Sequence, residues 1–227
     1  MKKIDLIFAL IVIAFFAPFF LVSDVYEFYA SFNKEHGMIT SFIKFAILAT
    51  MGEIIGLRIR IGKYNQKGFG ILPRMLVWGL LGLTIKAAFV IFAKGAPIFL
   101  EYMGVENVTA AMKGDFTNVK FLGAFTISVT LNLIFSPVLM TFHKITDIHI
   151  SNNKGTLRGL FRTFRFGQII ESLDWHTQWN FVFKKTIPLF WIPAHTLTFM
   201  LPPDSQILFA ALLGIALGVI LAIANGK

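Results

Sequence analysis

Residues 186–209 read TIPLFWIPAHTLTFMLPPDSQILF, and this stretch decides the class of fold. It is almost wholly apolar, yet it contains four prolines, three threonines and a histidine. In a water-soluble core such a helix would be poor, because an interior proline removes a backbone hydrogen bond and clashes with the preceding turn. In a membrane bundle, neighbouring helices and Ser or Thr hydroxyls satisfy the freed backbone groups. The stretch therefore indicates a helix built for lipid and close helix neighbours.

The composition of the whole chain also favours a membrane protein. Of the 227 residues, 56% are hydrophobic and 15% are charged, and the mean hydropathy is +0.72. A soluble domain carries roughly 25% charged residues. The formal net charge of +9 does not indicate nucleic-acid binding, because the basic residues gather on one side of the predicted topology. The chain has no cysteine, which excludes disulfides, thiolate metal sites and cysteine catalysis.

Six apolar stretches predict an all-α fold, a polytopic transmembrane helix bundle that forms a single domain over residues 1–227. The first stretch has a basic start like a signal peptide, but no small-residue cleavage site follows, so we expect a retained helix. In the last stretch, Gly214 and Gly218 predict a packing face of small residues. The predicted spans are residues 4–22, 41–57, 75–92, 121–142, 186–201 and 206–224.

The distribution of Lys and Arg predicts the orientation of the bundle. Six spans place both termini on one side of the membrane, and most of the 21 Lys and Arg residues fall on that side. Cytoplasmic segments carry such an excess of positive charge. Both termini are therefore predicted to be cytoplasmic, or on the matrix side in an organelle. The opposite side carries only Lys34, Lys94, Lys113 and Lys120.

A basic region between the fourth and fifth predicted spans has the pattern of an amphipathic helix. Residues 157–166 place apolar side chains at i, i+3, i+4 and i+7 and arginines on the other faces, as in a helix that lies in the cytoplasmic membrane interface. We expect the lipid bilayer and anionic lipid head groups as partners of this helix. Whether the protein forms a homo-oligomer is left open. The apolar stripe is Leu157, Leu160, Phe161 and Phe164, and the basic residues are Arg158, Arg162 and Arg165.

Two charged residues inside predicted spans are the first candidates for function. Glu53 lies in the second span and Lys86 in the third, and an ionised group in hydrocarbon is costly unless it is paired or hydrated. One interpretation is a structural ion pair that joins the two spans, with Arg58, Arg60 or Arg74 as alternative partners for Glu53. The other interpretation is that both residues line a hydrated cavity or pore.

Uncharged polar residues in the fourth and fifth spans form a second group of candidates. Ser128, Asn132 and Ser136 recur every four positions and so share one helix face. They are either interhelical contacts or a polar stripe along a pore. His195 lies near the middle of the fifth span. It is either a hydrogen-bond partner across helices or a polar group at a constriction that responds to pH.

The sequence lacks the motifs of common enzyme and cofactor sites. It has no G-x-x-x-x-G-K-[ST] phosphate loop, no G-x-S-x-G elbow, no H-E-x-x-H and no EF-hand loop. His143, Asp147 and His149 are residue types that bind metals, but only the first two share a helix face. We therefore expect no enzyme activity, no catalytic residues, no metal site and no cofactor.

Several motifs follow one another in an order known from a family of small membrane proteins. Gly52-Glu53 lies near the end of an early span, Arg74 leads into a glycine-bearing span, and a proline-rich pair of spans ends the chain. In this order the chain, from Ser41 onwards, resembles the Mpv-seventeen/peroxisomal membrane protein family. It looks like a distant bacterial-type relative, which implies a location in the bacterial inner (plasma) membrane. The family-like structural positions are Gly52, Arg74, Pro193, Phe199 and Pro202.

Departures from the family pattern imply a distant branch. Glu53 stands where the family has Asp, and Ile192, Thr198 and Gln206 stand where it has Trp, Asn and Arg. The first predicted span is additional to the usual set. Family members look like weakly selective channels or solute pathways, so the resemblance implies a channel-like activity.

These observations together predict a channel-like or carrier-like membrane protein for small polar solutes or ions. One alternative is a non-transporting scaffold that binds lipid or a partner through residues 157–166, and a membrane-embedded lipid enzyme is the third. A continuous hydrated cavity that touches Glu53 and His195 would favour transport, whereas a dry interior would favour the scaffold. The predicted pore or cavity lining is Glu53, Lys86, Ser128, Asn132 and His195.

Overall fold

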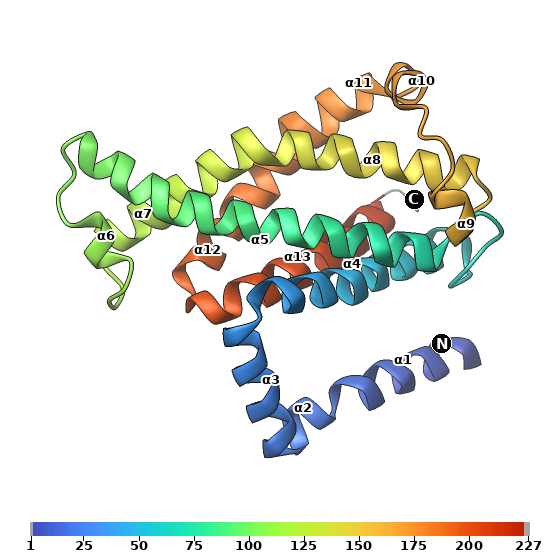
Figure 1. The fold of residues 1–227 in the computed structure, drawn as a ribbon, viewed down its shortest axis with the longest axis horizontal. Coiled ribbons are helices and arrows are strands. Elements are labelled where there is room, and N and C mark those ends of the chain that lie inside the picture. The colour runs from blue at the N-terminus through green and yellow to red at the C-terminus, as the bar shows by residue number, and fades with distance from the viewer. Residues whose placement is uncertain (1, 225–227) are drawn as a thin grey trace. The chain divides into compact units, whose positions relative to one another are not determined.

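The computed structural model describes residues 2–224, which are helical apart from their connections (Figure 1). The described residues contain no β-strand, so the predicted all-α class is confirmed. By their internal contacts, residues 1–40 and residues 41–227 form two compact units.

The first unit consists of short helices with little interior. These are α1 (Lys3–Phe16), α2 (Pro18–Leu21) and α3 (Ser23–Glu35). None of their described residues is buried, and Phe20 keeps 85% of its surface exposed. An apolar surface of this kind is expected where side chains face lipid rather than a protein core.

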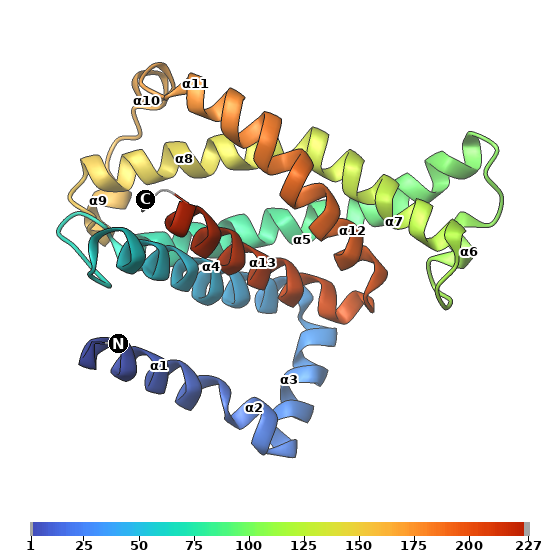
Figure 2. The same ribbon diagram turned by 180° about the vertical axis from the view of Figure 1, so that it is seen from behind.

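Within residues 2–224, four helices are long and apolar enough to cross a membrane. Their apolar side chains stay exposed along much of their length, as with Ile91 (66%) and Val138 (68%), which suits contact with lipid. These helices indicate an integral membrane protein, and Figures 1 and 2 show α4, α5, α8 and α13 side by side. The four are α4 (Gly37–Ile61), α5 (Ile71–Tyr102), the run of α7 (Asn118–Thr130), π-helix η1 (Leu131–Phe135) and α8 (Ser136–Asn152), and α13 (Pro203–Ala224).

The prediction of six spans is therefore wrong in number, and prolines explain both differences. The stretch 4–22 is divided between α1 and α2 at Pro18, which has no N–H to continue the hydrogen-bond ladder of α1. The 14 residues of α1 cover about 21 Å at ~1.5 Å per residue, less than the ~30 Å hydrocarbon layer.

The predicted fifth span, residues 186–201, falls across two helix types. The span begins inside π-helix η2 (Gln178–Trp191) and continues as α12 (Ile192–Met200). The short helix α11 (Trp175–Thr177) comes directly before η2. Pro188 lies inside η2 and Pro193 in the first turn of α12, and each removes one backbone donor. Wider π-type turns are a common adjustment at such points. Figure 2 shows this bent segment running from α11 to α12 beside α7 and α8.

Glycines bring α4 and α5 into close contact. The hydroxyl of Ser41 donates to the carbonyl of Gly82 at 2.7 Å, so the two backbones lie unusually close there. A Cβ atom on Gly82 would lie 2.8 Å from both the Ser41 carbonyl oxygen and Cβ of Phe45. The register between these helices therefore depends on the absence of a side chain at Gly82.

Replacing Gly82 by alanine is expected to destabilise the bundle by about 1–3 kcal/mol, because the new methyl group overpacks the contact between α4 and α5. Thermal unfolding in detergent micelles, followed by circular dichroism, measures the effect. The control is Gly95→Ala on the same helix, where a Cβ would meet nothing within 4 Å. That substitution should be neutral or stabilising because alanine favours helix. Equal loss in both variants would contradict the packing argument.

The small-residue face predicted on α13 is present in part. Gly218 faces α4, since a Cβ there would lie 3.3 Å from the carbonyl oxygen of Gly52. A Cβ on Gly52 would in turn lie 3.0 Å from Cα of Ile215. Gly214 has open space on its Cβ side and lines a cavity instead. Only Gly218 of the predicted pair is a packing position.

The amphipathic helix predicted over residues 157–166 is wrong as a single element. The chain forms α9 (Leu157–Leu160), leaves the helix, and begins α10 at Phe166–Glu171. Tertiary contacts override the stripe, because His149 Nε2 lies 3.0 Å from the carbonyl oxygen of Leu160 and its ring packs on that of Phe164. The remaining short helix, α6 (Val108–Ala111), lies in the connection between α5 and α7.

Candidate functional site

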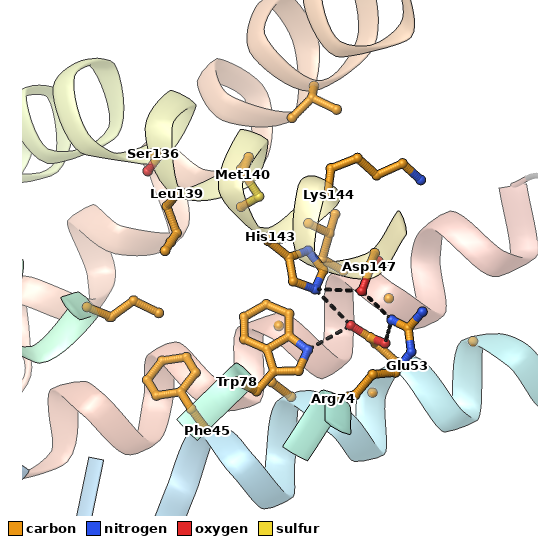
Figure 3. Close-up of a pocket in the computed structure, with 18 of the residues that line it drawn as sticks. Phe45, Glu53, Arg74, Trp78, Ser136, Leu139, Met140, His143, Lys144 and Asp147 are labelled. Carbon is orange, nitrogen blue, oxygen red and sulfur yellow. Dashed lines mark hydrogen bonds and ion pairs between the residues drawn. The ribbon is translucent and has the colours of Figure 1, made fainter. Parts of the chain in front are cut away.

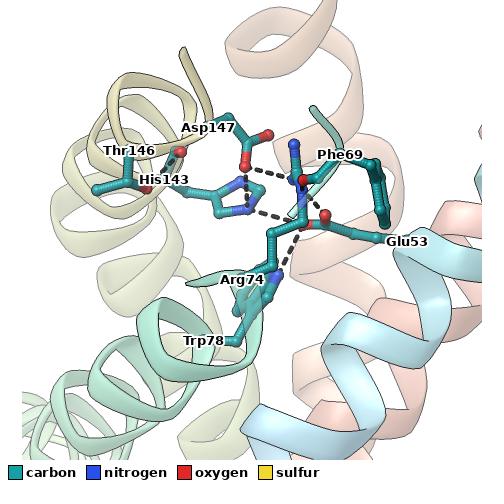
Figure 4. Close-up of polar contacts among 7 residues, drawn as sticks. All are labelled: Glu53, Phe69, Arg74, Trp78, His143, Thr146 and Asp147. Carbon is teal, nitrogen blue, oxygen red and sulfur yellow. Dashed lines mark hydrogen bonds and ion pairs between the residues drawn. The ribbon is translucent and has the colours of Figure 1, made fainter. Parts of the chain in front are cut away.

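A cluster of charged and aromatic side chains joins α4, α5 and α8 (Figure 4). Glu53 comes from α4, Arg74 and Trp78 from α5, and His143 and Asp147 from α8. Residues four apart on a helix lie on the same face, so α5 and α8 each present two side chains towards Glu53. We call these five residues the polar cluster.

Arg74 is the centre of the polar cluster. Its Nη1 forms an ion pair with Glu53 and a second ion pair with Asp147 at 2.5 Å. Its Nε donates to the carbonyl oxygen of Phe69 at 2.8 Å, and its guanidinium carbon lies 4.5 Å from the centre of the Phe69 ring. Contacts on both sides of the fork hold the guanidinium in one orientation between two carboxylates.

Glu53 receives two further partners. Trp78 Nε1 donates to Glu53 Oε1 at 2.7 Å, and His143 Nε2 lies 3.0 Å from the same oxygen. His143 Nε2 also lies 3.6 Å from Asp147 Oδ1. The polar cluster thus contains two acids, one permanent cation and one histidine. Its charges balance when His143 carries a proton.

The structure assigns the partner that the sequence left open. Arg74, rather than Lys86, is the ion-pair partner of Glu53. Lys86 lies 12 residues beyond Arg74 on α5, which is about 18 Å along the helix axis at ~1.5 Å per residue. This separation is too great for Lys86 to reach Glu53.

A second polar network lies where η1 meets α12. Asn132 donates from Nδ2 to the Ser128 carbonyl at 2.8 Å and accepts at Oδ1 from the Ser136 hydroxyl at 2.9 Å. Its amide nitrogen lies 3.0 Å from Nδ1 of His195. The shared face that the spacing predicts is therefore real, and it forms an interhelical contact. Pro137, in the first turn of α8, explains the π-helical turn here, because its missing N–H leaves a carbonyl of the preceding turn without an α-helical donor.

Aromatic rings surround His195. The ring centre of Trp191 lies 5.0 Å away in a stacked arrangement, and that of Phe89 lies 5.6 Å away, edge to face. Phe199 closes the group at 6.4 Å. His195 is only 7% exposed, so its orientation is fixed by Asn132 on one side and these rings on the others.

A cavity of about 800 Å³ is lined by residues of the polar cluster and by residues around His195 (Figure 3). Along α5 its lining extends from Arg74 to Phe89, which is about 22 Å at ~1.5 Å per residue. Its outer end is lined by exposed residues of the connection between α4 and α5, and its inner end by His195, Trp191 and Phe89. Figure 3 shows His143 and Asp147 reaching from α8 towards Glu53 and Arg74, with Met140 on the same helix nearby.

The structure separates the predicted lining residues into two groups. Glu53 and His195 line the cavity. Lys86, Ser128 and Asn132 are not among the described lining residues, and Ser128 and Asn132 are fully buried in contacts between helices. Ser136, from the face predicted as either an interhelical contact or a polar stripe along a pore, also lines the cavity. Residues that the sequence did not single out for the lining include Arg74, Trp78, His143, Asp147, Gln178 and Trp191.

The family-like positions also have physical roles in the fold. Gly52 contacts α13, and Arg74 is the centre of the polar cluster. Pro193 begins α12, Phe199 is 2% exposed and packs on Phe89, and Pro202 lies in the turn before α13. Each of these roles is a contact or a turn, and none is specific to one activity.

Glu53, His143 and Asp147 bring ligand-type atoms within 4.8 Å of one another. The spacing resembles that of a cation site, and the signal in the sequence was the pair His143 and Asp147 on one helix face. Arg74, however, already forms ion pairs with both carboxylates. The guanidinium thus takes the position and the charge that a bound cation would supply.

No protein-family model, curated protein or solved structure matches the chain. The class of protein is therefore defined by the fold alone, as a helical membrane protein with four candidate spans. The resemblance to the Mpv-seventeen/peroxisomal membrane protein family stays a prediction.

Proposed function

We propose that this protein carries small polar solutes across a membrane through the cavity between Glu53 and His195. The single observation that supports this function is the cavity itself, which touches both residues. The wall of this cavity of about 800 Å³ is largely apolar but also carries carboxylates, two guanidinium groups, histidines and amides, which can bind water and polar solutes. A bundle that served only as a scaffold would be expected to close such a space by packing.

The charges at the outer end of the cavity favour entry of polar solutes from that side. Arg60, Lys67 and Lys144 line this end and are exposed. Charged walls around a cleft concentrate polar and ionic solutes at its mouth. By the positive-inside rule we assign this end to the cytoplasm of a bacterial inner membrane.

At the opposite end α7 and α12 pack closely against each other, and we take this packing to close the cavity on that side. Ser128 donates from Oγ to the Ile192 carbonyl at 2.7 Å, and Ile127 and Thr198 are completely buried. A path that is open on one side and closed on the other favours a carrier-like mechanism over a permanently open channel. In this mechanism the contact of Asn132 with His195 is the gate.

Flux into proteoliposomes tests the proposed function. The purified protein is reconstituted, and the uptake of a panel of small neutral solutes, anions and cations is compared with that of empty liposomes. Glu53→Gln should lower flux at least about tenfold, because it removes a charge that faces the path and holds Arg74 and His143 in place. Glu171→Gln, an exposed acid on α10 outside the cavity, is the matched control and should keep normal flux.

Two results would contradict the proposal. If no solute crosses faster than through empty liposomes, transport is excluded and the scaffold interpretation takes its place. If Glu53→Gln folds normally and keeps full flux, the polar cluster is not part of the path. Circular dichroism and the elution profile in detergent establish that each variant is folded.

A further inference from the structure

The inner end of the cavity contains a buried donor without an acceptor. Among the described residues, Nε1 of Trp191 has no hydrogen-bond partner. Trp191 is 8% exposed, and its side chain lines the cavity next to His195. Buried N–H groups in native proteins are nearly always paired, so an unpaired one beside a cavity points to a ligand atom that would accept from it.

An acceptor that is linked to His195 through Asn132 also lines the cavity. Ser136 lines the cavity, and its hydroxyl proton is engaged by Asn132 Oδ1 at 2.9 Å. A hydroxyl that donates to the protein keeps its lone pairs for a partner. Asn132 also contacts His195, on which Trp191 stacks, so the donor and the acceptor belong to one group of side chains.

The lack of charged side chains at the inner end, among the described lining residues, favours an uncharged ligand. The charged residues that line the cavity belong to the polar cluster or to the outer end, and the inner end is formed by apolar and aromatic side chains with His195. An ion here would lose its hydration without a counter-charge. A neutral hydroxyl group meets both needs, because it accepts from an N–H and donates to an oxygen.

A second unpaired atom lies further along the wall. Among the described residues, Oε1 of Gln178 also has no hydrogen-bond partner, and Gln178 is 6% exposed and lines the cavity. Gln178 and Trp191 are the first and last residues of η2, so the two atoms are separate points on the wall. A carbonyl oxygen accepts from a hydroxyl group and repels an anion.

From these contacts we infer that the inner end of the cavity binds small uncharged hydroxyl compounds, which accept a hydrogen bond from Trp191 Nε1 and donate one to Ser136 Oγ. This inference rests on the proposed function in one respect, since it takes the cavity as the place of the solute. It names the class of solute as small alcohols and polyols.

Indole N–H resonances of the ¹⁵N-labelled protein in nanodiscs test this inference without measuring flux. The resonance of Trp191 is the one that Trp191→Phe removes. Glycerol should shift it saturably, whereas the exposed Trp175 should change only in proportion to concentration. Acetate, of similar size but charged, should leave the Trp191 resonance in place at equal concentration.

The variant Ser136→Ala should weaken glycerol binding about fivefold, the loss expected for one hydrogen bond. Ser205→Ala, in the exposed first turn of α13, is the matched control and should bind glycerol as the unaltered protein does. The inference is overturned if Trp191 responds no more than Trp175, if acetate shifts it equally, or if Ser136→Ala binds glycerol normally.

These outcomes are independent of the flux experiment. Saturable binding at Trp191 with no flux of any solute would remove the proposed function and leave the binding site. Flux without a response at Trp191 to glycerol would remove the inference and leave transport.

Discussion

Replacing Arg74 by methionine is expected to lower the free energy of unfolding by about 3–5 kcal/mol, the loss typical of breaking a buried ion pair from one side. Glu53 and Asp147 would then face each other as acids whose side chains are only 18% and 20% exposed. The guanidinium also fixes the Phe69 carbonyl, which would lose its donor. Chemical or thermal unfolding in micelles, followed by circular dichroism, measures the change.

Neutralising Glu53 and Asp147 as well shows how much of the lost stability comes from unpaired charge and how much from lost packing. In the triple variant Arg74→Met, Glu53→Gln, Asp147→Asn, no unpaired charge remains among these residues, so a large part of the lost stability should return. Lys86→Met removes another partly buried cation from α5, outside the polar cluster, and should cost much less. If the triple variant is no more stable than Arg74→Met, the cost does not come from uncompensated charge.

A cysteine introduced at Met140 is expected to react with a charged, membrane-impermeant thiol reagent at least about tenfold faster than one introduced at Val138, because thiolates form only where water reaches them. Both residues lie on α8, but Met140 lines the cavity and Val138 is 68% exposed on the apolar outer surface. The absence of native cysteine makes each variant a single-thiol protein. The rate of labelling in proteoliposomes measures access to water.

Labelling also tests the path. A bulky charged group on Met140→Cys should stop flux, because it fills the cavity beside the polar cluster, whereas the few Val138→Cys molecules that react should show no change. The assignment of the cavity as a hydrated path would be wrong if the two positions reacted equally. It would also be wrong if full labelling of Met140→Cys left flux unaltered.

The membrane class was predictable from the sequence because hydrophobicity is a property of each residue and needs no contacts. The predicted spans 41–57 and 75–92 lie within α4 and α5, although both helices extend beyond them. Helical hydrogen bonding does not stop where the apolar window stops. Prolines account for the error in number, since Pro18 and Pro188 interrupt stretches whose hydropathy alone resembles that of a span.

The partner of Glu53 could not be chosen from the sequence, because it depends on the register between two helices. Close packing of Gly82 against Ser41 fixes that register and brings Arg74 level with Glu53. The spacing of Ser128, Asn132 and Ser136 predicted their shared face, since this is a local property of one helix. That Asn132 contacts His195 could not be predicted, because this contact depends on how η1 and α12 pack.

The unpaired N–H at the inner end of the cavity also could not be predicted from the sequence. Trp191 lies in an apolar stretch where a tryptophan is equally suited to facing lipid at the membrane interface. Only the folded structure shows that its N–H is buried and has no partner among the described residues. An unpaired donor is a property of the whole environment, so no spacing rule predicts it.

The π-helical turn of η1 has a consequence for how Asn132 could move. Such a turn contains one residue more than an α-helical turn would, and the surplus can pass along a helix without breaking it. Each residue of surplus corresponds to a rotation of about 100° around the axis. If the surplus moved from η1 towards α7, Asn132 would swing away from His195 while His143 and Asp147 kept their places. Such a rotation would break the contact between Asn132 and His195 and leave the polar cluster in place.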